Sequence, residues 1–203
     1  MPLDLRPYLD PEQCALVVFE CQENVIGKGS RIPTLVAAVE RSGMLPPLAR
    51  LLAAARKARV LVIFCNAEGR EDGLGAPITP LHERQARAPA PAGGARDTSV
   101  VAALAQQPGD VVLARAHGMS GFHGTSLDPI LRSRGVRTLL VCGVSLNIGV
   151  LGTALEAVNH GYRVVIPSDC VAGDPPEYGE QVLRYTLRNL AWVATSEAIL
   201  SAW

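Results

Sequence analysis

Short, almost continuously apolar runs recur along this chain, separated by longer segments with helical periodicity. Runs such as 15–19 (ALVVF) and 138–142 (TLLVC) show no alternation of apolar and polar residues. Such a run is typical of a strand whose sheet is covered on both faces. A repeated succession of strand, helix and strand implies right-handed crossovers and a parallel sheet. The pattern predicts six strands, at 15–19, 60–64, 111–113, 138–142, 163–166 and 191–194.

The segments between these strands complete an α/β pattern with helices on both faces of the sheet. A length of 203 residues fits one domain, so we expect a single domain over 1–203. One region, 69–96, is rich in Gly, Pro and Ala and has no clear period. It follows the second strand, so we expect a lid or binding loop there, or else an insertion without a role. Helices are predicted at 48–58, 97–105, 125–134, 147–160 and 177–189.

Composition and charge exclude several classes of function. Nineteen basic residues balance nineteen acidic ones, which disfavours a nucleic-acid-binding face and a polybasic membrane tether. No apolar stretch approaches the ~18 residues of a membrane span. The N-terminal segment has no basic-then-apolar signal pattern. Five cysteines, most of them inside apolar runs, indicate reduced thiols in a cytoplasmic protein. We therefore expect a small-molecule substrate, with no nucleic acid and no membrane.

Motifs for cofactors and metals fail on their spacing. The segment 143–152 (GVSLNIGVLG) follows a strand and opens a helix, but it matches neither GxGxxG nor GxxxxGK[ST]. The segment 118–121 (GMSG) is not a GxSxG nucleophile elbow. The four histidines show no HExxH spacing and no pairing with a CxxC. We expect no cofactor and no metal ion.

Polar residues follow four of the predicted strands. Because the carboxyl ends of parallel strands meet at one edge of the sheet, these residues converge on a single crevice. Two acids, an Arg and the start of a helix suit an anionic substrate and proton transfer. Alternatively, Glu20 and Arg115 form only a structural ion pair. The converging residues are Glu20, Gln22, Asn66, Glu68, Arg115, His117, Ser145, Asn147, Ile148 and Gly149.

Three segments carry a resemblance to a known family. Residues 17–24 (VVFECQEN) are similar to the strand-end motif IDMQND of the isochorismatase-like, or cysteine hydrolase, superfamily. The segment 120–128 (SGFHGTSLD) and the segment that follows at 131–173 (LRSRGVRTLLVCGVSLNIGVLGTALEAVNHGYRVVIPSDCVAG) resemble the family nearly from end to end. The resemblance implies a three-layer Rossmann-like α/β sandwich with a six-stranded parallel sheet, assembled as a homo-oligomer, a dimer or tetramer. It also implies a cis peptide bond between Val144 and Ser145.

This chain departs from the family pattern at all three catalytic positions. Most members hydrolyse amides with an Asp–Lys–Cys triad, whose Cys is a nucleophile at a helix N-terminus. Glu20 stands at the Asp position and Gly149 at the Cys position, where glycine offers no nucleophile. The Lys position falls on Arg115 or on Ala116, depending on the direction in which residues are counted.

A cysteine-free branch of the family, which includes isochorismatase, resembles this chain in its Gly at the Cys position. Those enzymes cleave a vinyl ether by protonating carbon and then adding water. The resemblance assigns Glu20 as the acid, Glu68 as a like charge that raises the pKa of Glu20, and Arg115 with the helix start at Gly149 as the clamp for a carboxylate. The candidate substrate-binding residues are Gln22, Asn66, His117, Phe122, Ser145, Asn147 and Gly149.

Two alternatives stay open beside this hypothesis of a cysteine-independent hydrolase. One is a catalytically inactive family member that acts as a binding or assembly protein. The other is a hydrolase whose catalytic groups have moved, with Cys21 or Cys65 as the nucleophile.

Overall fold

The computed structural model describes residues 4–87 and 97–203. Six strands form one sheet in the order β3-β2-β1-β4-β5-β6, and every neighbouring pair is parallel. This confirms the predicted α/β fold. The strands are β1 (Cys14–Phe19), β2 (Leu61–Ala67), β3 (Val111–Arg115), β4 (Thr138–Gly143), β5 (Arg163–Pro167) and β6 (Trp192–Ala194).

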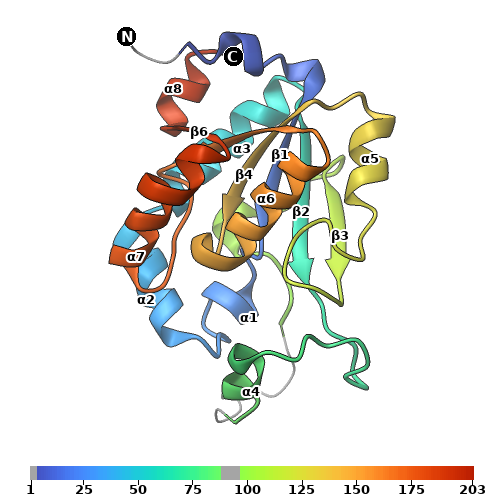
Figure 1. The fold of residues 1–203 in the computed structure, drawn as a ribbon, viewed down its shortest axis with the longest axis vertical. Helices are drawn as coiled ribbons and strands as arrows, with labels where there is room; N and C mark the ends of the chain where they lie inside the picture. The colour runs from blue at the N-terminus through green and yellow to red at the C-terminus, as the bar shows by residue number, and fades with distance from the viewer. Residues whose placement is uncertain (1–3, 88–96) are drawn as a thin grey trace.

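Helices cover both faces of this sheet, so its two central strands are buried along their whole length. Every residue of β1 and β4 is buried, which explains their unbroken apolar sequences. Figure 1 shows α6 in front of the sheet and α3 behind it, with α1 and α4 beyond the carboxyl ends of the strands. The helices are α1 (Glu23–Ile26), α2 (Pro33–Ser42), α3 (Leu45–Lys57), α4 (Pro80–Arg87), α5 (Leu127–Ser133), α6 (Leu151–Asn159), α7 (Pro176–Gln181) and α8 (Ser196–Leu200).

The prediction of a helix at 97–105 is wrong. Only one 3-10 turn, Ala102–Leu104, forms there. The backbone of this segment bonds to the chain that follows β1, because Glu23 and Asn24 donate their N–H groups to the carbonyls of Ser99 and Asp97, both at 2.9 Å. These contacts between distant segments take the place of local helical hydrogen bonds.

The other predicted helices are present with changed limits. The predicted helix 147–160 begins as a π-helical turn, Leu146–Val150, before α6. The predicted helix 177–189 divides into α7, a second π-helical turn and a 3-10 turn. Helix α4 lies inside the segment 69–96, which showed no period, whereas residues 88–96 lie outside the described part of the chain. No helix within the described ranges is long and apolar enough to cross a membrane.

The strand order reverses between β1 and β4, where open α/β sheets bind their ligands. Phe19 and Gly143 are partners at this point. Gly143 has φ of 100°, and a Cβ there would lie 2.2 Å from the carbonyl oxygen of Phe19, so only glycine fits. The peptide bond between Val144 and Ser145 is cis, as the family resemblance implied.

Candidate active site

A cavity of about 440 Å³ opens beyond the carboxyl ends of the strands. Its size suits a small molecule. Glu20 reaches it from the end of β1, Arg115 from the end of β3, and Ser145 and Gly149 from the segment after β4. The sequence-based expectation that strand ends converge therefore holds for these four residues, and also for His117 and Ile148.

Glu20 occupies the first position after β1 in an uncommon backbone conformation. Its φ is 51°, in the left-handed region that costs a non-glycine residue about 1–2 kcal/mol. Its N–H group donates to the carbonyl of Cys65 at 3.0 Å, which holds the turn against β2. Its side chain lines the cavity and forms an ion pair with Arg115. A strained residue held in this way is typical of a functional site.

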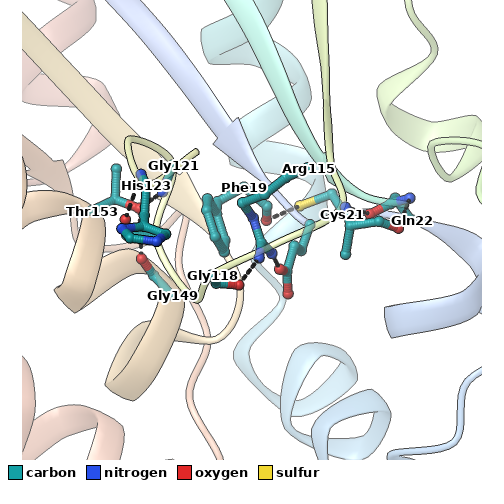
Figure 2. A network of polar contacts seen from close by, with 12 residues as sticks. Phe19, Cys21, Gln22, Arg115, Gly118, Gly121, His123, Gly149 and Thr153 are labelled. Atoms are coloured by element: carbon teal, nitrogen blue, oxygen red, sulfur yellow. Dashed lines mark hydrogen bonds and ion pairs between the residues drawn. The ribbon is translucent and has the colours of Figure 1, made fainter. Parts of the chain in front are cut away.

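Arg115 is the last residue of β3, and its side chain is only 6% exposed. Besides the ion pair with Glu20, its Nη1 donates to the carbonyl of Gly118 (Figure 2). Burial lowers the pKa of the guanidinium to about 10, which still leaves Arg115 charged at neutral pH. Ala116 also lines the cavity but has no polar side chain. Of the two residues proposed for the Lys position, Arg115 is the one that contacts Glu20.

Gly149 lies inside the π-helical turn Leu146–Val150, which follows β4 and precedes α6. Thr153 links this turn to the loop after β3, because its Oγ1 donates to the Gly149 carbonyl at 2.7 Å and accepts from the Gly121 N–H at 2.9 Å (Figure 2). His117 also lines the cavity, and its Nδ1 lies 2.6 Å from the carbonyl oxygen of Gly75. The loop after β3 and the turn after β4 therefore form one connected wall.

Several sequence-predicted site residues are not among the described residues that line the cavity. Gln22 is fully buried, and its amide bonds to the backbone of Ala67 and Thr98, which ties β1 to β2 and to the segment 97–100. Asn147 bonds through its side chain to the backbone of Asp174. The remaining three are Asn66, buried within β2; Glu68, half-buried after β2; and Phe122, whose ring stacks on His160.

The cavity also has a wall that sequence reasoning missed. Arg31, Asn24 and Asp97 line it, as does His82 from α4. The Oδ1 of Asn24 is buried and has no hydrogen-bond partner among residues 4–87 and 97–203. The position of Asn24 inside the motif at 17–24 was a usable signal, whereas no local pattern marked Arg31. Over the same ranges, no group of three or more His, Cys, Asp or Glu side chains is placed to hold a metal ion.

Comparison with known proteins decides the family. The model of the isochorismatase domain matches residues 14–198, which is most of the chain. The chain belongs to the isochorismatase family. A ureidoacrylate amidohydrolase of Methylorubrum extorquens is 31% identical over 95% of this chain and 85% of its own length.

Solved structures of this family superpose over nearly the whole chain. An isochorismatase family protein from Desulfovibrio vulgaris has a TM-score of 0.79 and is 28% identical, covering 92% of this chain and 96% of its own. An N-carbamoylsarcosine amidase from Thermoplasma acidophilum has a TM-score of 0.70 and is 25% identical, covering 91% and 97%. The chain thus belongs to this family by fold and by sequence.

None of the five cysteines places its thiol in the cavity, where it could replace the nucleophile that is missing at Gly149. All five are buried, and none is among the described residues that line the cavity. Burial raises the pKa of the Cys21 thiol and of the Cys65 thiol to about 12. A thiolate, the reactive form, is therefore disfavoured at both positions where a relocated nucleophile was considered.

The native thiols are expected to react very slowly with 5,5′-dithiobis(2-nitrobenzoate). At pH 8, a thiol with a pKa near 12 is ionised in only about one molecule in ten thousand. The absorbance of the released nitrothiobenzoate should report less than about one reacted thiol per chain in the native protein and all five in urea. A stoichiometric fast phase in the native protein would instead identify an accessible, activated cysteine.

Proposed function

We propose that this chain hydrolyses a small anionic substrate of the vinyl ether type by proton transfer from Glu20, without a covalent cysteine intermediate. The observation that supports this most directly is the Glu20–Arg115 ion pair in the wall of the cavity. It places a group that transfers protons beside a group that binds carboxylates. Gly149 and the buried thiols leave no nucleophilic sulfur beside them.

The ion pair sets the protonation state in the absence of substrate. A guanidinium within ion-pair distance favours the ionised form of a carboxyl, so Glu20 is a carboxylate at rest. A substrate carboxylate that binds Arg115 takes the place of Glu20 as its partner. Glu20 is then an unpaired carboxylate in a largely buried place, which favours its proton uptake. In this proposal the anionic substrate itself converts Glu20 into the acid.

The reaction then needs only this proton and one water molecule. Glu20 gives its proton to the terminal carbon of the enol ether, and the electron pair of the double bond forms the new C–H bond. The oxocarbenium ion that results adds water at the adjacent carbon, and the water returns a proton to the Glu20 carboxylate. The hemiketal collapses with proton transfer to the ether oxygen, which leaves as an alcohol, and a ketone remains. The Arg115 guanidinium holds the substrate carboxylate throughout.

A catalytically inactive family member is the second candidate, and the same ion pair favours it. Glu20 and Arg115 neutralise each other when the cavity is empty, and breaking a buried pair has a cost. If no ligand separates them, the cavity serves binding or assembly alone. The two candidates differ in whether a carboxylate displaces Glu20 from Arg115.

The test is calorimetry and turnover with a matched pair of probes. A 2-alkoxypropanoate carries the carboxylate but has no double bond, so it binds without reacting. Its binding heat, measured in buffers of different ionisation enthalpy, should show uptake of about one proton per chain near neutral pH. The corresponding 2-alkoxyacrylate should be converted to pyruvate and the alcohol.

Four outcomes separate the hypotheses. Turnover that survives complete alkylation of accessible thiols supports proton transfer, whereas its loss on alkylation points to a relocated cysteine. Hydrolysis of small amides with no hydrolysis of the 2-alkoxyacrylate contradicts the proposal. Absence of turnover on all of these substrates, with no proton uptake, supports the inactive family member.

A further inference from the structure

The ring of Phe19 fills the space in which a side chain at residue 149 would lie. Phe19 is the last residue of β1 and is fully buried. A Cβ built on Gly149 would lie 2.2 Å from Cε1 of this ring, 2.8 Å from Cδ1 and 3.1 Å from Cζ. The first two distances are too short for a carbon atom, so every side chain at 149 requires the ring to move.

The same ring is also in contact with Arg115. The guanidinium carbon of Arg115 lies 5.1 Å from the ring centroid, within the range of a cation–π contact. Figure 2 shows Phe19 between Gly149 and Arg115. The Nε of Arg115 is buried and has no hydrogen-bond partner among the described residues. Within residues 4–87 and 97–203, the contacts that hold the Arg115 guanidinium are those with the Phe19 ring, the Glu20 carboxylate and the Gly118 carbonyl.

We propose that Phe19 and Gly149 form a complementary pair, in which the ring takes the volume of a side chain at 149 and holds Arg115 against Glu20. Phe19 is then a positioning residue, and it explains physically why the position at which the family carries its nucleophile is glycine here. The steric fit between the Phe19 ring and Gly149 does not depend on whether the chain catalyses a reaction. The positioning of Arg115 deepens, and rests on, the function proposed above.

A double-mutant cycle tests the fit of the ring against Gly149. Gly149→Cys is measured in the native background and in Phe19→Ile, because in the motif IDMQND an Ile precedes the Asp at whose position Glu20 stands. In the native background we expect Tm to fall by about 5 °C or more, the result of overpacking a core of this size. In the Phe19→Ile background the same substitution should lower Tm by less than half as much.

The new thiol gives a second readout that needs no catalytic activity. Phe19→Ile/Gly149→Cys should react with 5,5′-dithiobis(2-nitrobenzoate) at one thiol more than Phe19→Ile alone, because Gly149 lines the cavity. If Gly149→Cys alone does not fold and the double variant does, the result also supports the fit, because removing the ring then restores folding. Equal losses of Tm in both backgrounds, or a double variant that fails while Phe19→Ile folds, would overturn it. Gly149→Ala repeats the comparison with a smaller side chain.

Exchange of the Arg115 Hε with water tests the positioning. Its resonance in protein labelled with ¹⁵N-arginine is identified by its absence in Arg115→Lys. Phe64→Ile is the matched control, because Phe64 is an equally buried ring on the neighbouring strand β2. We expect exchange about tenfold faster in Phe19→Ile than in the native protein, and unchanged exchange in Phe64→Ile. Equal exchange rates in the two variants would show that Phe19 does not hold Arg115, whether or not the chain proves to be a hydrolase.

Discussion

Replacement of Glu20 by glutamine is expected to lower kcat for a 2-alkoxyacrylate by about 10²–10⁴-fold, the usual contribution of a positioned general acid. Glutamine keeps the size of the side chain and a hydrogen-bonding oxygen for Arg115, but it has no proton to deliver. KM should fall, because Arg115 remains to bind the substrate carboxylate and the neutral glutamine competes less for its guanidinium than the Glu20 carboxylate does. Steady-state assays of pyruvate formation measure both constants.

The control for this variant is Glu40→Gln, which removes an exposed acid of α2 that is not among the described residues lining the cavity. It should leave kcat and KM as they are. Glu68→Gln tests the sequence-based assignment of Glu68 as an assistant to Glu20. A loss of kcat confined to Glu20→Gln assigns the proton to Glu20 alone, whereas undiminished turnover in Glu20→Gln contradicts the mechanism.

The strands could be predicted from the sequence because their burial leaves a direct mark on it. Both faces of β1 and β4 are covered, so their runs contain only apolar residues apart from Thr138 and Gly143. The prediction of a helix at 97–105 was wrong because the backbone of this segment forms hydrogen bonds with residues after β1. Such long-range hydrogen bonds leave no mark on the local sequence pattern. Helix α4 was missed because, within its described residues, it buries no side chain fully, and a helix without a buried face leaves no clear apolar period.

The sequence predicted which residues lie near the site, because the ends of the strands determine where those residues are placed. It did not predict the directions of their side chains. The rule that strand ends converge brought Glu20, Arg115 and Gly149 to one cavity, but it does not tell which way a side chain turns. Gln22 follows the same strand as Glu20, yet its side-chain amide forms hydrogen bonds with backbone groups and does not line the cavity. Phe19 could not be predicted as a site residue, because a Phe inside an apolar run indicates only a residue of the hydrophobic core. Only the distances to Gly149 and Arg115 reveal its place.

Arg115→Met is expected to lower the free energy of unfolding by about 3–5 kcal/mol, the typical effect of removing one partner from a buried ion pair. The methionine matches much of the side-chain volume but leaves the Glu20 carboxylate without its cation. Urea denaturation followed by the fluorescence of Trp192 and Trp203 measures the change. Arg115→Lys should lose less, since the charge is kept while the second bond, to the Gly118 carbonyl, is lost.

The pH dependence of this loss shows whether an unpaired charge is its cause. An isolated carboxylate in a mostly buried place takes up a proton more readily than one in water, so the native state of Arg115→Met binds a proton that the unfolded chain releases. The variant should therefore lose stability relative to the native protein as pH rises, with a larger deficit at about pH 8 than at about pH 5. In Glu20→Gln/Arg115→Met, where no carboxylate is left, the deficit should be smaller than the sum of the single losses and nearly independent of pH. A deficit below about 1 kcal/mol that does not vary with pH would be the behaviour of a solvent-screened surface pair, and Glu20 could not then be the acid that an incoming carboxylate creates.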